Sequence, residues 1–169
     1  MASPSYQEIF KNLAEDKVRY LVVGGTAVVF SGYARMTMDL DLLPDLESEN
    51  LEKMISILDR LGYKPNITVP ITAILDKEKR EIWQREKGMK VFMLYHPEDL
   101  LNKVDILVFH PIDFEEAYNR RQRVITDENY EIPVVKIEDL INLKRIAGRS
   151  QDLHDIRVLQ KIREQQNDR

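Results

Sequence analysis

Two aspartates alternate with apolar residues in segment 37–42, which reads Thr-Met-Asp-Leu-Asp-Leu. Side chains of a strand alternate between the two faces of a sheet, so Asp39 and Asp41 would share one face. At roughly 3.3 Å of rise per residue their Cα atoms lie about 7 Å apart, which lets both carboxylates converge on one Mg²⁺. A divalent ion held in this way can also carry substrate phosphates. The pattern therefore predicts a metal-dependent site for a nucleoside triphosphate.

The residues around these aspartates predict a strand over Met36–Leu43, closed by Pro44. D-x-D also occurs in exposed loops, where it needs no metal. Two carboxylates on an otherwise apolar strand require cations or hydrogen bonds, which favours the metal site. The apolar face of this strand is predicted to comprise Met36, Met38, Leu40 and Leu42, and the polar face Thr37, Asp39 and Asp41.

A pair of glycines, Gly24-Gly25, ends the apolar strand Tyr20–Val23. Paired glycines permit a tight turn in which backbone N–H groups approach phosphate oxygens. Glycines after a strand also serve simply as a turn. Thr26 then opens a short buried helix that extends to about Gly32. Next to the two acids, the glycine turn favours phosphate binding.

A third carboxylate is expected because two divalent cations need more than two acidic ligands. Asp105 is the candidate, since it lies in the strongly apolar predicted strand Lys103–Phe109. An isolated acid there is costly unless it is paired or bound to a metal. The alternative is a salt bridge to Lys103 or to an arginine.

The predicted helix Ile137–Ala147 and the residues after it offer cations for a triphosphate. Arg149 could bind phosphate through two parallel hydrogen bonds, and Lys144 could act as a point charge. Asp152 and Asp155 follow at i, i+3 spacing, where they would also favour the N-terminal dipole of the last helix. The packed face of the first of these helices is predicted to comprise Leu140, Leu143 and Ala147.

The order of predicted elements indicates an α+β or mixed α/β fold, with a central mixed sheet flanked by helices and a C-terminal helical pair. Residues 1–136 would form the core and residues 137–169 a helical segment packed on it. Ile67–Leu75 could be a strand, although Pro70 argues against a place at the sheet centre, and Lys77–Lys87 could be a helix or an exposed hairpin. The other expected helices are Ser5–Asp16, a helix from Ser48 to Leu61, Phe114–Arg121 and Leu153–Gln165; the other expected strands are Val91–Tyr95 and Glu131–Val135, the latter at an edge because of Pro133.

The composition excludes several classes of protein. The chain has 169 residues, a net charge of −4 and no cysteine. Disulfides, zinc–thiolate sites and cysteine nucleophiles are therefore absent, and no protein-wide positive field attracts nucleic acid. No apolar run approaches the roughly 20 residues of a membrane helix, and the first residues lack the pattern of a signal peptide. We expect a cytoplasmic protein.

Taken together, these motifs resemble the nucleotidyltransferase superfamily, which has the polymerase-β-like fold. The glycine pair, the D-x-D strand and the later aspartate resemble its core over about Tyr20–Val108. The ending Lys144-x-x-Ala-x-Arg-x-x-Asp-x-x-Asp155 is most similar to the small AbiEii-type branch, which includes toxins of bacterial toxin–antitoxin systems. A dinucleotide-binding G-x-G-x-x-G and a P-loop are both absent.

The resemblance implies transfer of an NMP group from an NTP to an acceptor, with release of pyrophosphate. Asp39 and Asp41 would hold Mg²⁺ or Mn²⁺, and Asp105 would complete the metal site and activate the acceptor hydroxyl. Lys144 would contact the triphosphate, while Asp152 and Asp155 would support the site. The nucleotide-binding set implied in this way comprises Gly24, Gly25, Thr26, Arg35, Thr37, Lys144 and Arg149.

The resemblance leaves the acceptor open between RNA such as tRNA, a protein hydroxyl and a small molecule. A cognate antitoxin or a homodimer would be the partner that helps to recognise it. Many relatives have Gly-Ser at the turn, whereas here the hydroxyl comes one place later, at Thr26. The rival hypothesis is a catalytically inactive module that keeps the fold and senses nucleotide or binds a partner protein.

Overall fold

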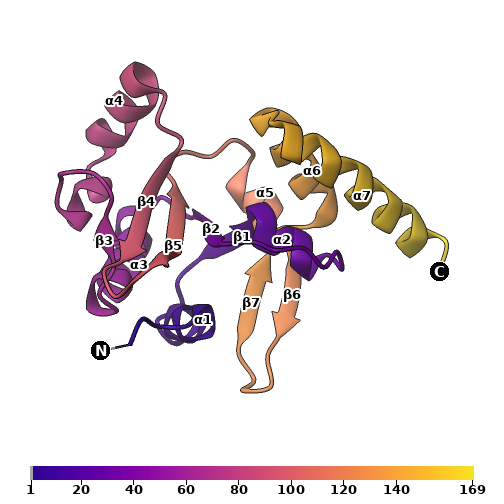
Figure 1. The fold of residues 1–169 in the computed structure, drawn as a ribbon, viewed down its shortest axis with the longest axis horizontal. Helices are drawn as coiled ribbons and strands as arrows, with labels where there is room; N and C mark the ends of the chain where they lie inside the picture. The colour runs from indigo at the N-terminus through magenta and orange to yellow at the C-terminus, as the bar shows by residue number, and fades with distance from the viewer. Residues whose placement is uncertain (1) are drawn as a thin grey trace.

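The computed structural model describes residues 2–169. Its centre is a seven-stranded mixed sheet with the order β3-β4-β5-β2-β1-β7-β6 (Figure 1). The order confirms the mixed sheet expected from the sequence. The strands are β1 (Tyr20–Val23), β2 (Asp39–Pro44), β3 (Lys64–Pro65), β4 (Val91–His96), β5 (Asp99–Leu107), β6 (Gln122–Ile125) and β7 (Glu131–Val134).

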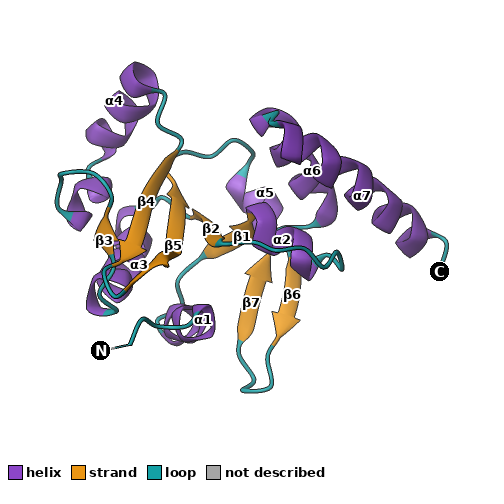
Figure 2. Cartoon of the chain, viewed as in Figure 1, coloured by secondary structure: helices purple, strands orange, loops and turns teal. Residues whose placement is uncertain are grey.

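Helices surround this sheet and close the chain. The C-terminal pair, α6 and α7, packs together, and α6 also contacts α2. Figure 2 shows this pair and α4 at opposite ends of the sheet. No helix within residues 2–169 combines the length and the apolar character needed to cross a bilayer. The helices are α1 (Tyr6–Glu15), α2 (Gly24–Phe30), α3 (Ser48–Arg60), α4 (Lys77–Lys87), α5 (Phe114–Asn119), α6 (Ile137–Ala147), α7 (Ser150–Asn167) and the 3₁₀ helix η1 (Ile71–Leu75).

The three central strands carry the core. β2 pairs antiparallel with β1 and parallel with β5. Leu40 and Leu42 are completely buried, as are Val104 and Ile106 on β5. The acids at the alternate positions are less buried and belong to the other face. The period-two pattern therefore places the apolar residues in the core and the acids along one face, as predicted.

Most predicted helices are confirmed, and their caps explain their ends. Ser5 caps α1, because its Oγ accepts a hydrogen bond from the Glu8 N–H at 3.2 Å. Asp76 caps α4 in the same way, through the N–H of Lys79 at 3.1 Å. This cap and Gly88 at the helix end select the helix over the hairpin for Lys77–Lys87.

The strand predicted over Met36–Leu43 begins too early. β2 starts at Asp39, and Met36 and Met38 are 87% and 51% exposed. The first half of the predicted apolar face therefore does not exist. Residues 33–38 instead form a loop that leads from α2 to the first aspartate. A periodic pattern cannot distinguish a strand from an extended loop that precedes it.

Three other expectations are corrected. Ile67–Leu75 contains η1 rather than a strand, because Pro70 precedes the first turn of this helix. β7, which contains Pro133, lies between β1 and β6 rather than at an edge. Its pairing with β1 is confined to Val22 and Val134, so the proline does not interrupt a long ladder. Ala147, expected on the packed face of α6, is exposed.

Candidate active site

Asp41 and Asp105 are direct neighbours on the parallel strands β2 and β5, where they occupy paired positions of the register. On the other side of β2, Asp41 pairs with Val23, the last residue before the glycine turn. Neighbouring strands are about 4.8 Å apart, so the two acids and the turn lie in one small region. The structure thus brings together two of the three predicted acids and the glycine pair.

Gly24 has the left-handed backbone angle φ = +62°, and the Asp41 side chain packs directly against it. A Cβ placed on Gly24 would lie 2.6 Å from Cγ of Asp41 and would collide with its carboxylate. A Cβ on Gly25 would lie 2.6 Å from both Nη2 of Arg35 and Oγ1 of Thr37. Gly24 is therefore required both by its backbone angle and by the Asp41 contact, whereas at Gly25 a side chain would have to displace those of Arg35 and Thr37.

The acids sit in an environment that opposes their ionisation. Burial raises the pKa of Asp41 to about 7, with further increases from the charges of Asp105 and Asp39. Burial likewise raises the pKa of Asp105 to about 6, and Asp39 adds to that increase. Positive charges on Lys144 and Arg149 act in the opposite direction on Asp41. The region is thus a negative cluster whose repulsion is only partly offset, which favours the binding of cations.

Asp105 has no ion pair among the residues that the structure describes, so its predicted alternative as a salt-bridged carboxylate is not observed. Its Oδ1 is buried and has no hydrogen-bond partner in the described part of the chain. Carboxylate oxygens are the ligands that Mg²⁺ prefers, so an unpartnered buried oxygen beside Asp41 fits a hard cation. Within residues 2–169, however, no group of three His, Cys, Asp or Glu side chains is close enough to hold a metal by itself.

Hydroxyl groups fix the backbone where the loop 33–38 joins β2 at Asp39. Thr26 and Thr37 both donate hydrogen bonds to the carbonyl oxygen of Asp39, at 3.3 and 3.4 Å. Thr26 is therefore engaged with the backbone of β2. The Tyr6 hydroxyl lies 2.7 Å from the carbonyl oxygen of Met38 and 3.0 Å from that of Lys103, and so links the residue just before β2 to β5. Tyr6 could not be found from the sequence, because only the fold brings α1 to these strands.

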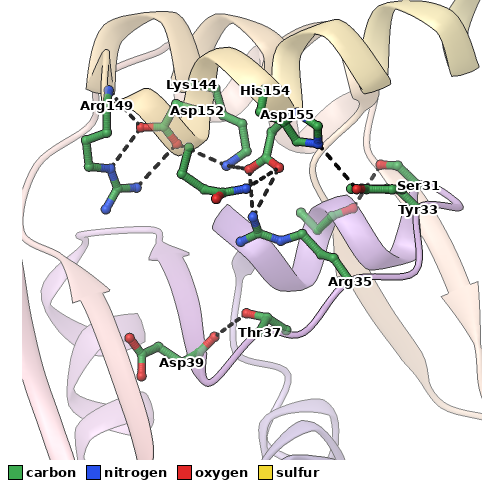
Figure 3. Close-up of polar contacts among 12 residues, drawn as sticks. Ser31, Tyr33, Arg35, Thr37, Asp39, Lys144, Arg149, Asp152, His154 and Asp155 are labelled. Carbon is green, nitrogen blue, oxygen red and sulfur yellow. Dashed lines mark hydrogen bonds and ion pairs between the residues drawn. The ribbon is translucent and has the colours of Figure 1, made fainter.

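The predicted C-terminal motif forms a buried network of charges (Figure 3). Lys144 is buried, and its Nζ lies 3.2 Å from Asp152 Oδ1 and 2.8 Å from Asp155 Oδ2. Arg35, from the loop before β2, donates to both oxygens of Asp155 at 3.1 Å. The network therefore joins α6 and α7 to the segment that carries the catalytic candidates.

Arg149 is the most accessible cation of this group, with 75% of its side chain exposed. Its Nε donates to Asp152 at 2.8 Å, and its backbone N–H donates to the same carboxylate at 3.1 Å. Asp152 therefore helps to cap α7, and it also binds two cations, Lys144 and Arg149. The hydrogen bond to Asp152 raises the pKa of Arg149, and the charges of Asp41 and Asp105 contribute to that increase.

This combination of a glycine turn, strand carboxylates and a mixed sheet places the protein in the class of nucleotidyltransferases. The chain belongs to the family described as "Nucleotidyltransferase of unknown function (DUF6036)", which matches residues 6–165. The family description makes it a nucleotidyltransferase, an enzyme that transfers a nucleotidyl group. The fold assigned to the superfamily from sequence motifs is confirmed. Comparison with curated proteins gives no match.

Solved structures of low sequence identity share this fold. The lincosamide antibiotic adenylyltransferase LnuA, bound to lincomycin, has a TM-score of 0.60 at 20% identity over 93% of this chain and 95% of its own. A putative nucleotidyltransferase from Thermotoga maritima has a TM-score of 0.56 at 16% identity, over 97% and 91%. ANT(2")-Ia in complex with adenylyl-2"-tobramycin has a TM-score of 0.54 at 12% identity, over 94% and 90%.

Proposed function

We propose that the protein is a metal-dependent nucleotidyltransferase that moves an NMP group from an NTP to a hydroxyl acceptor. The observation that carries this proposal is the in-register pair Asp41 and Asp105, packed beside the turn at Gly24. A structural role would leave these carboxylates paired with cations. Here burial and mutual repulsion raise both pKa values, and one oxygen of Asp105 has no partner within residues 2–169.

Asp105 is the proposed general base. Burial raises the pKa of its carboxyl group to about 6 in the metal-free protein, and its Oδ1 has no hydrogen-bond partner within residues 2–169, so this oxygen is the candidate proton acceptor. It accepts the proton of the acceptor hydroxyl as that oxygen attacks the α-phosphorus of the NTP. A new P–O bond forms, the bond from the α-phosphorus to the bridging oxygen of the β-phosphate breaks, and pyrophosphate leaves with the electron pair.

Asp39, Asp41 and Asp105 would hold the divalent cation, Mg²⁺ or Mn²⁺. When bound, the cation supplies Lewis-acid stabilisation of the phosphate oxygens and offsets the repulsion among these carboxylates. The missing side chains of Gly24 and Gly25 admit Asp41, Arg35 and Thr37 close to the turn, and the backbone N–H groups of this turn are the proposed cradle for the triphosphate. Arg149 provides the accessible positive charge, whereas Lys144 is buried between two acids and acts by positioning them. Thr26 and Thr37 donate hydrogen bonds to the carbonyl oxygen of Asp39 and so position the backbone at the start of β2.

Two types of acceptor have specific support. LnuA is named as a lincosamide antibiotic adenylyltransferase, and ANT(2")-Ia was solved with adenylyl-2"-tobramycin. Both favour ATP and a small hydroxyl compound as the first pair to test. The motif from Lys144 to Asp155 supports a second candidate, an AbiEii-type toxin that modifies RNA such as tRNA or a protein and has a cognate antitoxin.

The test is transfer of radioactive label from each α-³²P-labelled NTP, with Mg²⁺ or Mn²⁺, to aminoglycosides, lincosamides, total tRNA and protein. We expect Asp39→Ala and Asp41→Ala each to lower transfer at least 100-fold and to keep the wild-type fold, since each variant lacks one metal ligand. Asp59→Ala, which removes an exposed aspartate from α3, is the matched control and should retain activity. Full transfer by both active-site variants would overturn the assignment. NTP binding without transfer to any acceptor would favour the binding-module hypothesis.

A further inference from the structure

Arg35 is held at one end by a carboxylate from the opposite end of the chain. Its Nη1 donates to Oδ1 and Oδ2 of Asp155, both at 3.1 Å. Asp155 is completely buried on α7 and is fixed in turn by Nζ of Lys144 at 2.8 Å and Nε2 of Gln151 at 3.3 Å. Figure 3 shows Arg35 reaching from its loop towards this carboxylate. A buried, multiply bonded acceptor leaves the guanidinium few alternative orientations.

The other side of the guanidinium has a donor without a protein partner. Nε of Arg35 is buried and has no hydrogen-bond partner within residues 2–169. Nη2 lies at the glycine turn, because a Cβ on Gly25 would be only 2.6 Å from it. In a planar guanidinium the Nε–H and Nη2–H groups point to the same side and form a fork that matches two oxygens of a phosphate. The unused fork therefore lies beside the turn.

The network contains more cations than carboxylates. Three cations, Lys144, Arg149 and Arg35, share the two carboxylates of Asp152 and Asp155. The cations outnumber the carboxylates of the network by one, and the charges of Asp41 and Asp105 act on Arg149 from outside it. An unpartnered N–H donor in a partly buried cation is costly unless a ligand satisfies it.

We infer that Asp155 is a positioning residue of the nucleotide site. It holds Arg35 through Nη1, so that the Nε–Nη2 fork binds two oxygens of the non-transferred phosphates of the NTP beside Gly25. This inference rests on the proposed function for the identity of the ligand. Helix α7 thus contributes to nucleotide affinity through Arg35, without a contact of Asp155 with the nucleotide.

The test is calorimetric titration with Mg²⁺ and inorganic tripolyphosphate, which probes the phosphate site independently of transfer. Arg35→Lys keeps the charge but loses the fork, and we expect at least a tenfold weaker Kd. Asp155→Asn should weaken binding by a similar factor, and the double variant by no more than the larger single effect. In transfer assays, KM for NTP should rise with a smaller change in kcat.

Asp139→Asn is the control, because it removes another buried carboxylate–arginine pair, with Arg120, from the neighbouring helix α6. Its Kd should stay within about twofold of the wild type.

Unchanged binding by Arg35→Lys would overturn the inference, and so would additive effects of the two substitutions. If Asp155→Asn fails to fold, the inference is tested with Arg35→Lys and Arg35→Gln. It is overturned if both variants bind tripolyphosphate with the wild-type Kd. If tripolyphosphate binding follows the expected pattern but no label is transferred, the proposed function fails and the phosphate site stands.

Discussion

The carboxylate of Asp41 packs against the Cα atom of Gly24, across the junction between β1 and β2. The glycine has φ = +62°, so two constraints meet at this residue. The backbone angle disfavours any side chain, and the carboxylate occupies the space that a side chain would need. The two constraints can be separated, because Gly88 has nearly the same angle, φ = +59°, and no atom of residues 2–169 outside its immediate surroundings lies within 4 Å of the place where its Cβ would be.

Gly24→Ala should abolish label transfer and lower the melting temperature, because the new methyl group displaces the Asp41 carboxylate. Gly88→Ala carries the same backbone cost, about 1 to 2 kcal/mol, without a collision. We expect the second variant to melt slightly earlier and to transfer label at the wild-type rate below its melting transition. Equal activity of the two variants would show that the Gly24–Asp41 contact is unimportant for catalysis.

The raised pKa of Asp41 predicts how stability depends on pH in the absence of divalent cations. The folded protein keeps a proton up to a pKa of about 7, whereas the unfolded chain loses it near the ordinary value of 3.8. Stability should therefore fall as pH rises between these values, by up to about 1.4 kcal/mol per pH unit. Asp41→Asn removes this titration, and should be more stable than the wild type at pH 8 but not at pH 4.

Urea unfolding in EDTA at a series of pH values measures this difference. Asp59→Asn, at an exposed position, provides the control and should follow the wild-type curve. Equal stability of Asp41→Asn and the wild type at pH 8 would contradict the conclusion that burial and charge repulsion raise the pKa of Asp41. Divalent cations should narrow the gap at pH 8, because they bind the ionised wild-type site.

Tyr6→Phe should weaken the link between the two acid-bearing strands. The lost hydroxyl contacts the carbonyl oxygen of Met38, just before β2, and that of Lys103 on β5. We expect a stability loss of about 1 kcal/mol and a kcat lowered by a factor on the order of ten or less. Tyr130→Phe removes a comparable contact with the Gln7 carbonyl, away from the acids, and should lower stability alone. A kcat loss of equal size in Tyr130→Phe would rule out a local effect of Tyr6.

Thermal melting with NTP and metal together reports on assembly of the whole site. A ligand at about 100 times its Kd adds about 2.7 kcal/mol, which corresponds to roughly 5 to 10 °C for a domain of this size. The shift should require both NTP and a divalent cation, and it should disappear in Asp39→Ala. A full shift in that variant would show that the nucleotide binds elsewhere.

The local part of the site could be predicted from the sequence. Alternation placed Asp39, Asp41 and Asp105 on strands, and the glycine pair marked the turn. The predicted strand start failed at Met36 because the loop continues the alternating pattern. These features depend on residues close together in the chain, so that backbone geometry alone constrains them.

The long-range part could not be predicted. Arg35 and Asp155 are 120 residues apart, and no periodicity connects them. The burial of Lys144 was likewise missed, because a lysine in an amphipathic helix is ordinarily exposed and its two acid partners lie on another helix. Pairings of this kind become visible only when tertiary packing is known.

The parallel pairing of β2 with β5 has a consequence for biosynthesis. Asp41 and Asp105 face each other only after the chain between them has been made, and Arg35 acquires its carboxylate partner only when α7 has emerged. Contacts between such distant residues form slowly, because a long loop must close first. A ribosome-bound chain that lacks α7 would therefore lack the carboxylate partner of Arg35, and under the proposed function nucleotidyl transfer would arise only late in synthesis.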